Sequence, residues 1–215
     1  WEIKQKALPV YEVPIEYCKY RLDNGRIKTQ ILTHIKLKGS LNAESDDTQK
    51  IISEYLGKSD PKTNDDLKKI LKKEGQKDPA VMTADGFLIN GNRRKWAFEQ
   101  LLNEYPEEKY KKLKVVILPG SEDPERPTVK DIAILENRFQ VYLTGKSEYS
   151  KMNKALTYYT NTLSGITLEE LLKDDPTFGD SDNKKFQQKI KKFKKEYFEP
   201  IKLMDEYLEA NNTKG

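Results

Sequence analysis

The stretch between Phe87 and Leu102 constrains the fold of this 215-residue chain more than any other. Residues 87–89 form a short apolar run, which Asn90-Gly91, the strongest two-residue turn signal, brings to an end. Beyond Gly91 the apolar residues change to helical spacing, at Ala97, Leu101 and Leu102. The pattern therefore predicts a strand that turns into a helix at Gly91.

A helix that begins at Gly91 predicts a binding site for an anion, which we expect to be a phosphate. The first turn of a helix has unpaired N–H groups and a partial positive charge, and a glycine allows a ligand to approach the backbone. Two guanidinium groups add full charges and planar donors. Arginines are also common on exposed helix surfaces, and that is the alternative reading. The candidate phosphate-binding residues are Asn90, Gly91, Asn92, Arg93 and Arg94.

The run Gly91-Asn92-Arg93-Arg94-Lys95-Trp96-Ala97 resembles the G-E-R-R-x-x-A signature of the ParB/sulfiredoxin superfamily. The resemblance implies an α/β (α+β) domain in which helices flank a small mixed sheet. It also implies a nucleoside triphosphate, CTP or ATP, bound together with Mg²⁺.

A second run, from Leu135 to Gln140, resembles the superfamily's L-x-E-N-x-Q-R box, which faces the triphosphate and its metal in nucleotide-binding members. The resemblance places Glu136 near Mg²⁺ and puts Asn137 and Arg138 near the phosphates, roles that suit a carboxylate, an amide and a guanidinium. The alternative for Glu136 is a surface carboxylate paired with a nearby lysine.

The sequence departs from the family pattern at two positions of the first motif. Asn92 stands where ParB proteins usually have glutamate, and Asn90 stands where the kinase-like members have aspartate. An amide can bond a phosphate or a base but cannot accept a proton as a general base. These departures favour binding over phosphotransfer or hydrolysis, although an NTPase stays among the alternatives.

The N-terminal region predicts a β-hairpin. Residues 10–13 and 15–22 are rich in β-branched and aromatic residues, 23–25 is a turn signal, and 26–35 resumes an extended pattern. The resemblance places an arginine of this region near the nucleotide, and Arg21 and Arg26 are the candidates. Some kinases of the superfamily use a glutamate from here as a base, which makes Glu12 and Glu16 catalytic candidates, although a carboxylate on a strand is more often simply solvated.

The rest of the first domain is expected to extend to residue 145, with a polar insertion at 39–66 that is a loop with one short helix. Helical spacing follows from Leu67 until Gly75, strands are predicted at 80–83 and 115–118, and Thr128 with Asp131 begins a further helix.

Residues 146–215 predict an all-helical second domain. Thr167 and Glu170 form a capping box, and the segment from Gly165 resembles the start of the helix-turn-helix of ParB proteins. A later helix is studded with lysines and is expected to end at Pro200. Lysines release counterions from a phosphate backbone, although such a face is usually only solvated. The candidate DNA contacts are Lys185, Lys189, Lys192 and Lys195.

Composition sets limits on function. Charged residues make up 34% of the chain and the net charge is +4, a modest basic balance. One cysteine excludes an intrachain disulfide, and one histidine leaves no recognisable zinc site. Without a membrane-length apolar run or a signal peptide, we expect a cytoplasmic protein.

The expected function is that of a ParB-like, DNA-associated regulator or switch in DNA maintenance, mobile-element or phage biology. By analogy with ParB proteins it could form a homodimer. The alternatives are an enzyme of the same superfamily, either a nuclease or a small-molecule kinase, and a non-catalytic interaction module.

Overall fold

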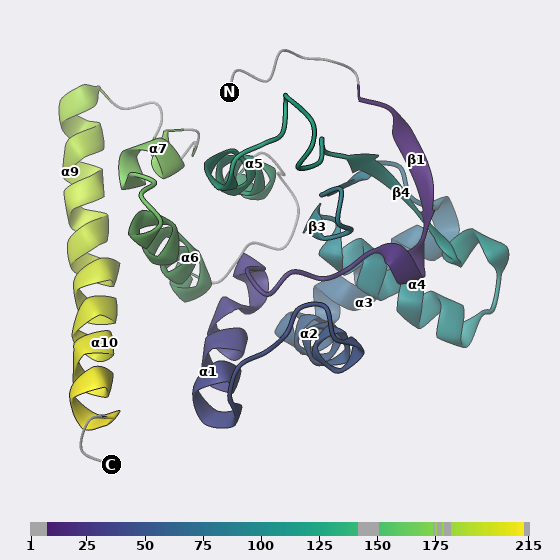
Figure 1. Ribbon diagram of the computed structural model, residues 1–215, viewed down its shortest axis with the longest axis horizontal. Coiled ribbons are helices and arrows are strands. Elements are labelled where there is room, and N and C mark those ends of the chain that lie inside the picture. The colour runs from purple at the N-terminus through teal and green to yellow at the C-terminus, as the bar shows by residue number, and fades with distance from the viewer. Residues whose placement is uncertain (1–7, 142–150, 174, 176–177, 179–181, 213–215) are drawn as a thin grey trace. The chain divides into compact units, whose positions relative to one another are not determined.

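The computed structural model describes residues 8–141, 151–173, 175, 178 and 182–212. It is a mixed α/β structure that divides into two compact units, residues 1–132 and 133–215 (Figure 1). The division falls within helix α5 (Val129–Val141) instead of at the expected boundary between residues 145 and 146. Each unit is described below by itself.

The first unit is built on a four-stranded sheet with the order β1-β4-β2-β3. Its strands are β1 (Val10–Pro14), β2 (Ala80–Met82), β3 (Leu88–Asn90) and β4 (Lys112–Ile117). Strand β1 runs antiparallel to β4, β4 runs parallel to β2, and β2 runs antiparallel to β3. The predicted strands at 80–83 and 115–118 are confirmed, and Gly86, with φ 95°, makes the turn into β3.

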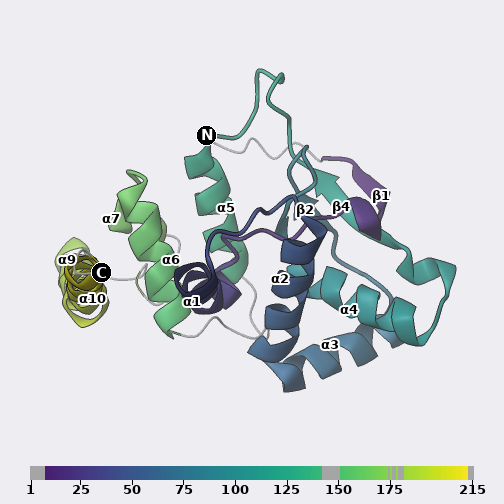
Figure 2. The same cartoon turned by 60° about the horizontal axis from the view of Figure 1, so that its bottom comes forward.

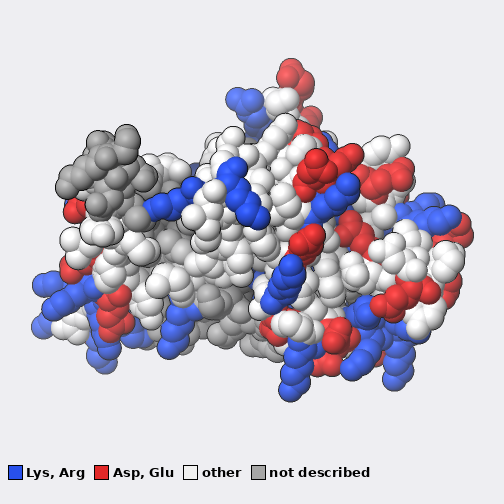
Figure 3. Space-filling model, turned by 90° about the horizontal axis from the view of Figure 1, so that it is seen from below, with Lys and Arg blue, Asp and Glu red and all other residues white. Residues whose placement is uncertain are grey.

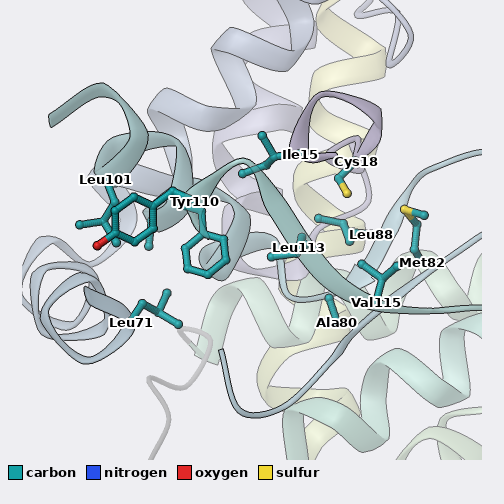
Figure 4. Close-up of a cluster of buried hydrophobic side chains, with 12 residues drawn as sticks. Ile15, Cys18, Leu71, Ala80, Met82, Leu88, Leu101, Tyr110, Leu113 and Val115 are labelled. Atoms are coloured by element: carbon teal, nitrogen blue, oxygen red, sulfur yellow. The ribbon is translucent and has the colours of Figure 1, made fainter. Parts of the chain in front are cut away.

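One face of the sheet packs on helices α3 (Pro61–Glu74) and α4 (Asn92–Glu104). Alternate residues of β4 bury their side chains in this core, as expected for a strand with one covered face. Leu71 comes from α3 and Leu101 comes from α4 (Figure 4), and Phe98 of α4 belongs to the same core. The core therefore fixes the start of α4 against the end of β3, where the sequence predicted the turn.

The predicted N-terminal hairpin is wrong. After β1 and a short 3-10 helix (Ile15–Tyr17), the chain makes only an isolated bridge between Lys19 and Phe87, and residues 28–38 form helix α1 (Lys28–Lys38). Asn24 starts this change, because its side chain accepts a hydrogen bond from the backbone N–H of Arg26 and caps a 3-10 turn (Gly25–Ile27). Ile27 and Ile31 are then buried at helical spacing against α2.

The polar segment 39–66 is not a loop. It contains α2 (Asp46–Ser59), which covers the predicted short helix, and the beginning of α3. Ser45 caps α2, while Asp60 caps α3 with Pro61 as the first helical residue, a position that proline favours. Ile52 and Leu56 are fully buried. They form a narrow apolar stripe that packs α2, an otherwise polar helix, against the core.

The second unit is helical. It contains α6 (Lys151–Leu163), α7 (Leu168–Leu172), α9 (Asn183–Phe193) and α10 (Glu199–Asn212). The predicted capping box of Thr167 and Glu170 is confirmed at the start of α7. Phe193 lies at the centre of an aromatic cluster, with ring contacts to Tyr158, Phe178, Tyr197 and Phe198.

Pro200 does not end the lysine-rich helix. A π-helical segment (Lys194–Phe198) joins α9 to α10, and the N–H of Glu199 bonds the carbonyl of Lys194. Proline lacks a backbone N–H and crowds the preceding turn, and the wider π-helical spacing accommodates it there. Figure 1 shows α9 and α10 as one continuous helix. No helix among the described residues is long and apolar enough to cross a lipid bilayer.

Candidate functional site

The turn at Gly91 has the geometry that the sequence predicted. Gly91 caps α4 in the left-handed conformation, with φ 97° and ψ 6°. A Cβ atom at this position would lie 2.5 Å from the Cβ of Ala80, so both the backbone and the packing require glycine. No side chain of the described residues caps α4. The partial positive charge of its first-turn N–H groups is therefore not neutralised by a side chain.

Asn92 begins the helix with a buried amide. Its Nδ2 atom donates a 3.0 Å hydrogen bond to the carbonyl of Leu88, which fixes the orientation of the side chain. Its Oδ1 atom is buried and has no hydrogen-bond partner in the part of the chain that the structure describes. A buried acceptor without a donor is uncommon in proteins, and such groups often mark a binding site.

Arg93 reaches from α4 to the first turn of α3. Its Nε atom donates to Oδ1 of Asn64 at 2.7 Å, and its Nη2 atom donates to the hydroxyl of Thr63 at 2.8 Å. Asn64 is itself 1% exposed and donates to the carbonyls of Leu56 and Gly57. The Arg93 guanidinium is therefore held in one place between two helix starts.

Arg26 approaches Arg93 from the 3-10 turn. Burial, and to a lesser extent the charge of Arg26, lowers the pKa of Arg93 to about 10, while the carboxylate of Asp60 acts in the opposite direction. Arg93 therefore feels a like charge from Arg26, which the carboxylate of Asp60 offsets in part. A bound anion would act on Arg93 in the same direction as Asp60.

Arg94 points elsewhere. Its Nη1 atom hydrogen-bonds the carbonyl of Asp78, before β2, and its Nη2 atom lies against Gly91. Burial lowers the pKa of Arg94, and the charge of Asp78 partly offsets this. The motif's two arginines therefore differ, since Arg93 turns toward α3 and Arg26, whereas Arg94 ties the helix start to the sheet.

The remaining candidates of the first unit make none of the contacts described above. Asn90 is half-buried at the end of β3 and pairs with Val81. Arg21 is half-buried and its charge acts on Asp23. Glu12 on β1 and Glu16 in the following 3-10 helix are both exposed.

The second box falls in the second unit and has a packing role there. Asn137 is buried; its Nδ2 atom hydrogen-bonds the carbonyl of Leu171, and its Oδ1 atom accepts a 2.8 Å hydrogen bond from the hydroxyl of Tyr158. The amide therefore joins α5 to α6 and α7. Glu136 is also buried and Arg138 is half-buried, and both have partners.

The described residues contain no group of three or more His, Cys, Asp or Glu side chains that could hold a metal ion. Mg²⁺ is often bound through one or two carboxylates together with the substrate's own phosphates, so the predicted Mg²⁺ at Glu136 does not depend on such a group. It stays a prediction.

The lysines of the second unit are exposed as expected. Lys185, Lys189, Lys192 and Lys195 all project into solvent from α9 and the π-helical segment. Figure 3 shows a group of lysine and arginine side chains at the lower left of the view. Lys192 lies 3.6 Å from Glu196, and Lys189 lies over the ring of Phe178 at 6.0 Å.

Sequence reasoning missed the residues that position Arg93. Thr63, Asn64 and Asp60 lie in the segment that was expected to be a loop, so no contact with the site was predicted for them, and Asn64 was expected only as a possible helix cap. The pair Asp60-Pro61 is a helix-start signal, and it could have placed Thr63 and Asn64 in a first turn. Their contact with Arg93 is tertiary and carries no local signal.

Comparison with known proteins finds no relative of this chain. The chain matches no family model, no curated protein and no solved structure.

Proposed function

We propose that the first unit binds the phosphate groups of a nucleotide at the start of α4, in the manner of a ParB/sulfiredoxin-like domain. The observation that carries this is the start of α4 at Gly91, which no side chain of the described residues caps and beside which Asn64 and Thr63 hold the Arg93 guanidinium. The charge of Arg26 also acts on Arg93, and a bound phosphate would add to the carboxylate of Asp60 in offsetting it. Both arginines were candidates from the sequence, on segments far apart in the chain.

Asn92 supports a ligand that is more than an inorganic anion. Its unpaired Oδ1 atom is an acceptor, so it calls for a donor or a cation and not for a phosphate oxygen. A nucleotide offers both kinds of group, because its phosphates suit the arginines and its sugar hydroxyls or base amino groups suit the amide oxygen. The expected ligand is CTP or ATP with Mg²⁺.

The second unit would contact DNA through the exposed lysines of α9. Lysines on one helix face neutralise backbone phosphates without reading sequence, so the expected binding is sequence-independent and falls steeply with salt. Together the two units would make a nucleotide-responsive DNA-associated protein, a regulator or switch in DNA maintenance, mobile-element or phage biology.

Titration calorimetry tests the nucleotide site. ATP, CTP, GTP and ADP are titrated with Mg²⁺ into the wild-type chain and into Arg26→Ala, with and without duplex DNA. We expect one nucleotide to bind and Arg26→Ala to weaken that binding about tenfold or more, as expected when a charge-assisted contact to phosphate is lost. Arg126→Ala, in the exposed connector before α5, removes the same charge and is the matched control.

Two results would overturn the proposal. One is that no nucleotide binds under any of these conditions, and the other is that Arg26→Ala binds as tightly as Arg126→Ala. Arg26 is preferred to Arg93 for this test because Arg93 also holds α3, so its removal would mix binding with stability.

A further inference from the structure

A pocket of about 530 Å³ lies on the first unit at the end of α3, beside β1, β4 and the 3-10 helix before β4 (Glu108–Tyr110). It shares no residue with the site at the start of α4. Its volume is in the range of small-molecule sites.

The rim of this pocket is strongly basic. Five lysines and two glutamates line it, which gives the lining a formal charge of +3. The lysines are Lys72, Lys73, Lys109, Lys112 and Lys114. Among the described residues only Lys109 of the five makes a salt bridge, to Glu107, and Lys72 lies over the ring of Tyr105. The charges of Lys73, Lys112 and Lys114 therefore remain available to a ligand.

The inner wall supplies a polar group that lacks a partner. Tyr110 is 1% exposed and packs with Leu71 and Phe98, which also line the pocket. Figure 4 shows its hydroxyl turned away from Leu113 and Val115, on the side of Leu71 and Leu101. This hydroxyl has no hydrogen-bond partner among the described residues. The Nζ atom of Lys109 lies over the ring, 4.8 Å from its centroid.

The wall beside Lys114 is rigid. Gln76 is buried, and its Nε2 atom donates to the carbonyls of Lys114 at 2.7 Å and Asp78 at 3.0 Å. Its Oε1 atom accepts a 2.8 Å hydrogen bond from the N–H of Lys114. The side-chain amide therefore fixes the backbone from which Lys114 projects.

We propose that this pocket binds a small molecule that carries a phosphate or polyphosphate group. Lysine ammonium groups are compact point charges that suit a multiply charged anion, and a tyrosine hydroxyl can donate to one of its oxygens. The apolar wall formed by Leu71 and Phe98 accommodates the uncharged part of the ligand. The site is separate from the nucleotide site proposed above and does not depend on it.

The test uses inorganic pyrophosphate as the probe and titration calorimetry on the full chain. Lys112→Ala with Lys114→Ala is expected to weaken binding about tenfold or more, since charge-assisted contacts are lost. The matched control is Lys36→Ala with Lys38→Ala, which removes two exposed lysines from the end of α1 and should bind as the wild type does.

Tyr110→Phe distinguishes a binding role from a structural one. It removes only the unpaired hydroxyl, so the unliganded protein should melt at the same or a higher temperature while affinity for pyrophosphate falls several-fold. In the Arg26→Ala background, where the site at the start of α4 is weakened, Lys112→Ala with Lys114→Ala should still reduce pyrophosphate binding about tenfold or more. The proposal is overturned if the pocket variants bind as the Lys36/Lys38 control does, or if Arg26→Ala alone abolishes pyrophosphate binding.

Discussion

The Nε atom of Arg93 donates a 2.7 Å hydrogen bond to the Oδ1 atom of Asn64, and this bond joins the first turn of α4 to the first turn of α3. Asn64 in turn donates to the carbonyls of Leu56 and Gly57, at the end of α2. One buried amide thus links three helices and holds the guanidinium beside Arg26.

Asn64→Ala should therefore destabilise the protein. It removes three hydrogen bonds, one from Arg93 and two to carbonyls at the end of α2, while Arg93 keeps its bond to Thr63, so we expect the free energy of unfolding to fall by about 2–3 kcal/mol. Urea denaturation measures this. Asn103→Ala, an exposed position on α4, is the control and should change stability little; an equal loss in both variants would contradict the role of Asn64.

Gly91→Ala should be costly for two separable reasons. The left-handed backbone costs about 1–2 kcal/mol for alanine, and the new Cβ, 2.5 Å from that of Ala80, adds about 1–3 kcal/mol of overpacking. Ala80→Gly removes the second cost only. In a double-mutant cycle measured by thermal melting, the double variant should regain part of the loss, and simple additivity of the two changes would refute the contact.

Lys95 and Glu99 should respond unequally to substitution. The Lys95 ammonium is bonded to Glu99 and lies 4.1 Å from the centre of the Tyr20 ring, and its side chain is 6% exposed against 29% for Glu99. Glu99→Gln leaves a buried cation, whereas Lys95→Met leaves a carboxylate that water can reach. We expect Glu99→Gln to destabilise by about 3 kcal/mol and Lys95→Met by less; chemical denaturation that ranks them in the reverse order would exclude this explanation.

Cys18 should be unreactive in the folded protein. The thiol is 2% exposed, and burial raises its pKa to about 11; the charge of Lys95 lowers the pKa and that of Glu99 raises it. Alkylation should therefore be slow in buffer and fast in denaturant, because the thiolate is the reactive form. Mass spectrometry after iodoacetamide treatment measures both rates, and rapid labelling of the native chain would contradict the burial of Cys18.

The raised pKa of Cys18 predicts that stability falls as the pH rises. The native state keeps the Cys18 proton when the unfolded chain has lost it, so this thiol has no effect below its ordinary pKa of 9.0 and reduces stability between pH 9 and about 11. Cys18→Ala should flatten the stability profile in that window relative to the wild type, measured by urea denaturation. An unchanged slope would contradict the assignment.

The sequence predicted the parts of the fold whose signals are local. The turn at Gly91, the helix after it and the capping box at Thr167 all depend on neighbouring residues, and all are confirmed. The predicted hairpin is wrong because residues 26–35 contain β-branched residues, which favour a strand locally. In the fold these residues form a helix, since Ile27 and Ile31 at helical spacing are buried against α2.

The candidate site was predictable only in part. The local motif identified Arg93 and Arg94 as site residues. It could not show that their roles differ, because Arg93 bonds to Asn64 and Arg94 to the carbonyl of Asp78 through tertiary contacts. The approach of Arg26 likewise follows from the fold. At Pro200 a strong local signal was misleading. Proline usually ends a helix, but here the π-helical segment before it allows the helix to continue.

The most direct test of the central claim is to follow backbone amide resonances during titration with Mg²⁺ and the nucleotide that calorimetry identifies. The amides of Asn92 and Arg93 should shift and saturate together, because the unpaired N–H groups at the start of α4 would bond the phosphates. Shifts confined to Lys112 and Lys114, or no shift at the start of α4 at saturation, would contradict the claim.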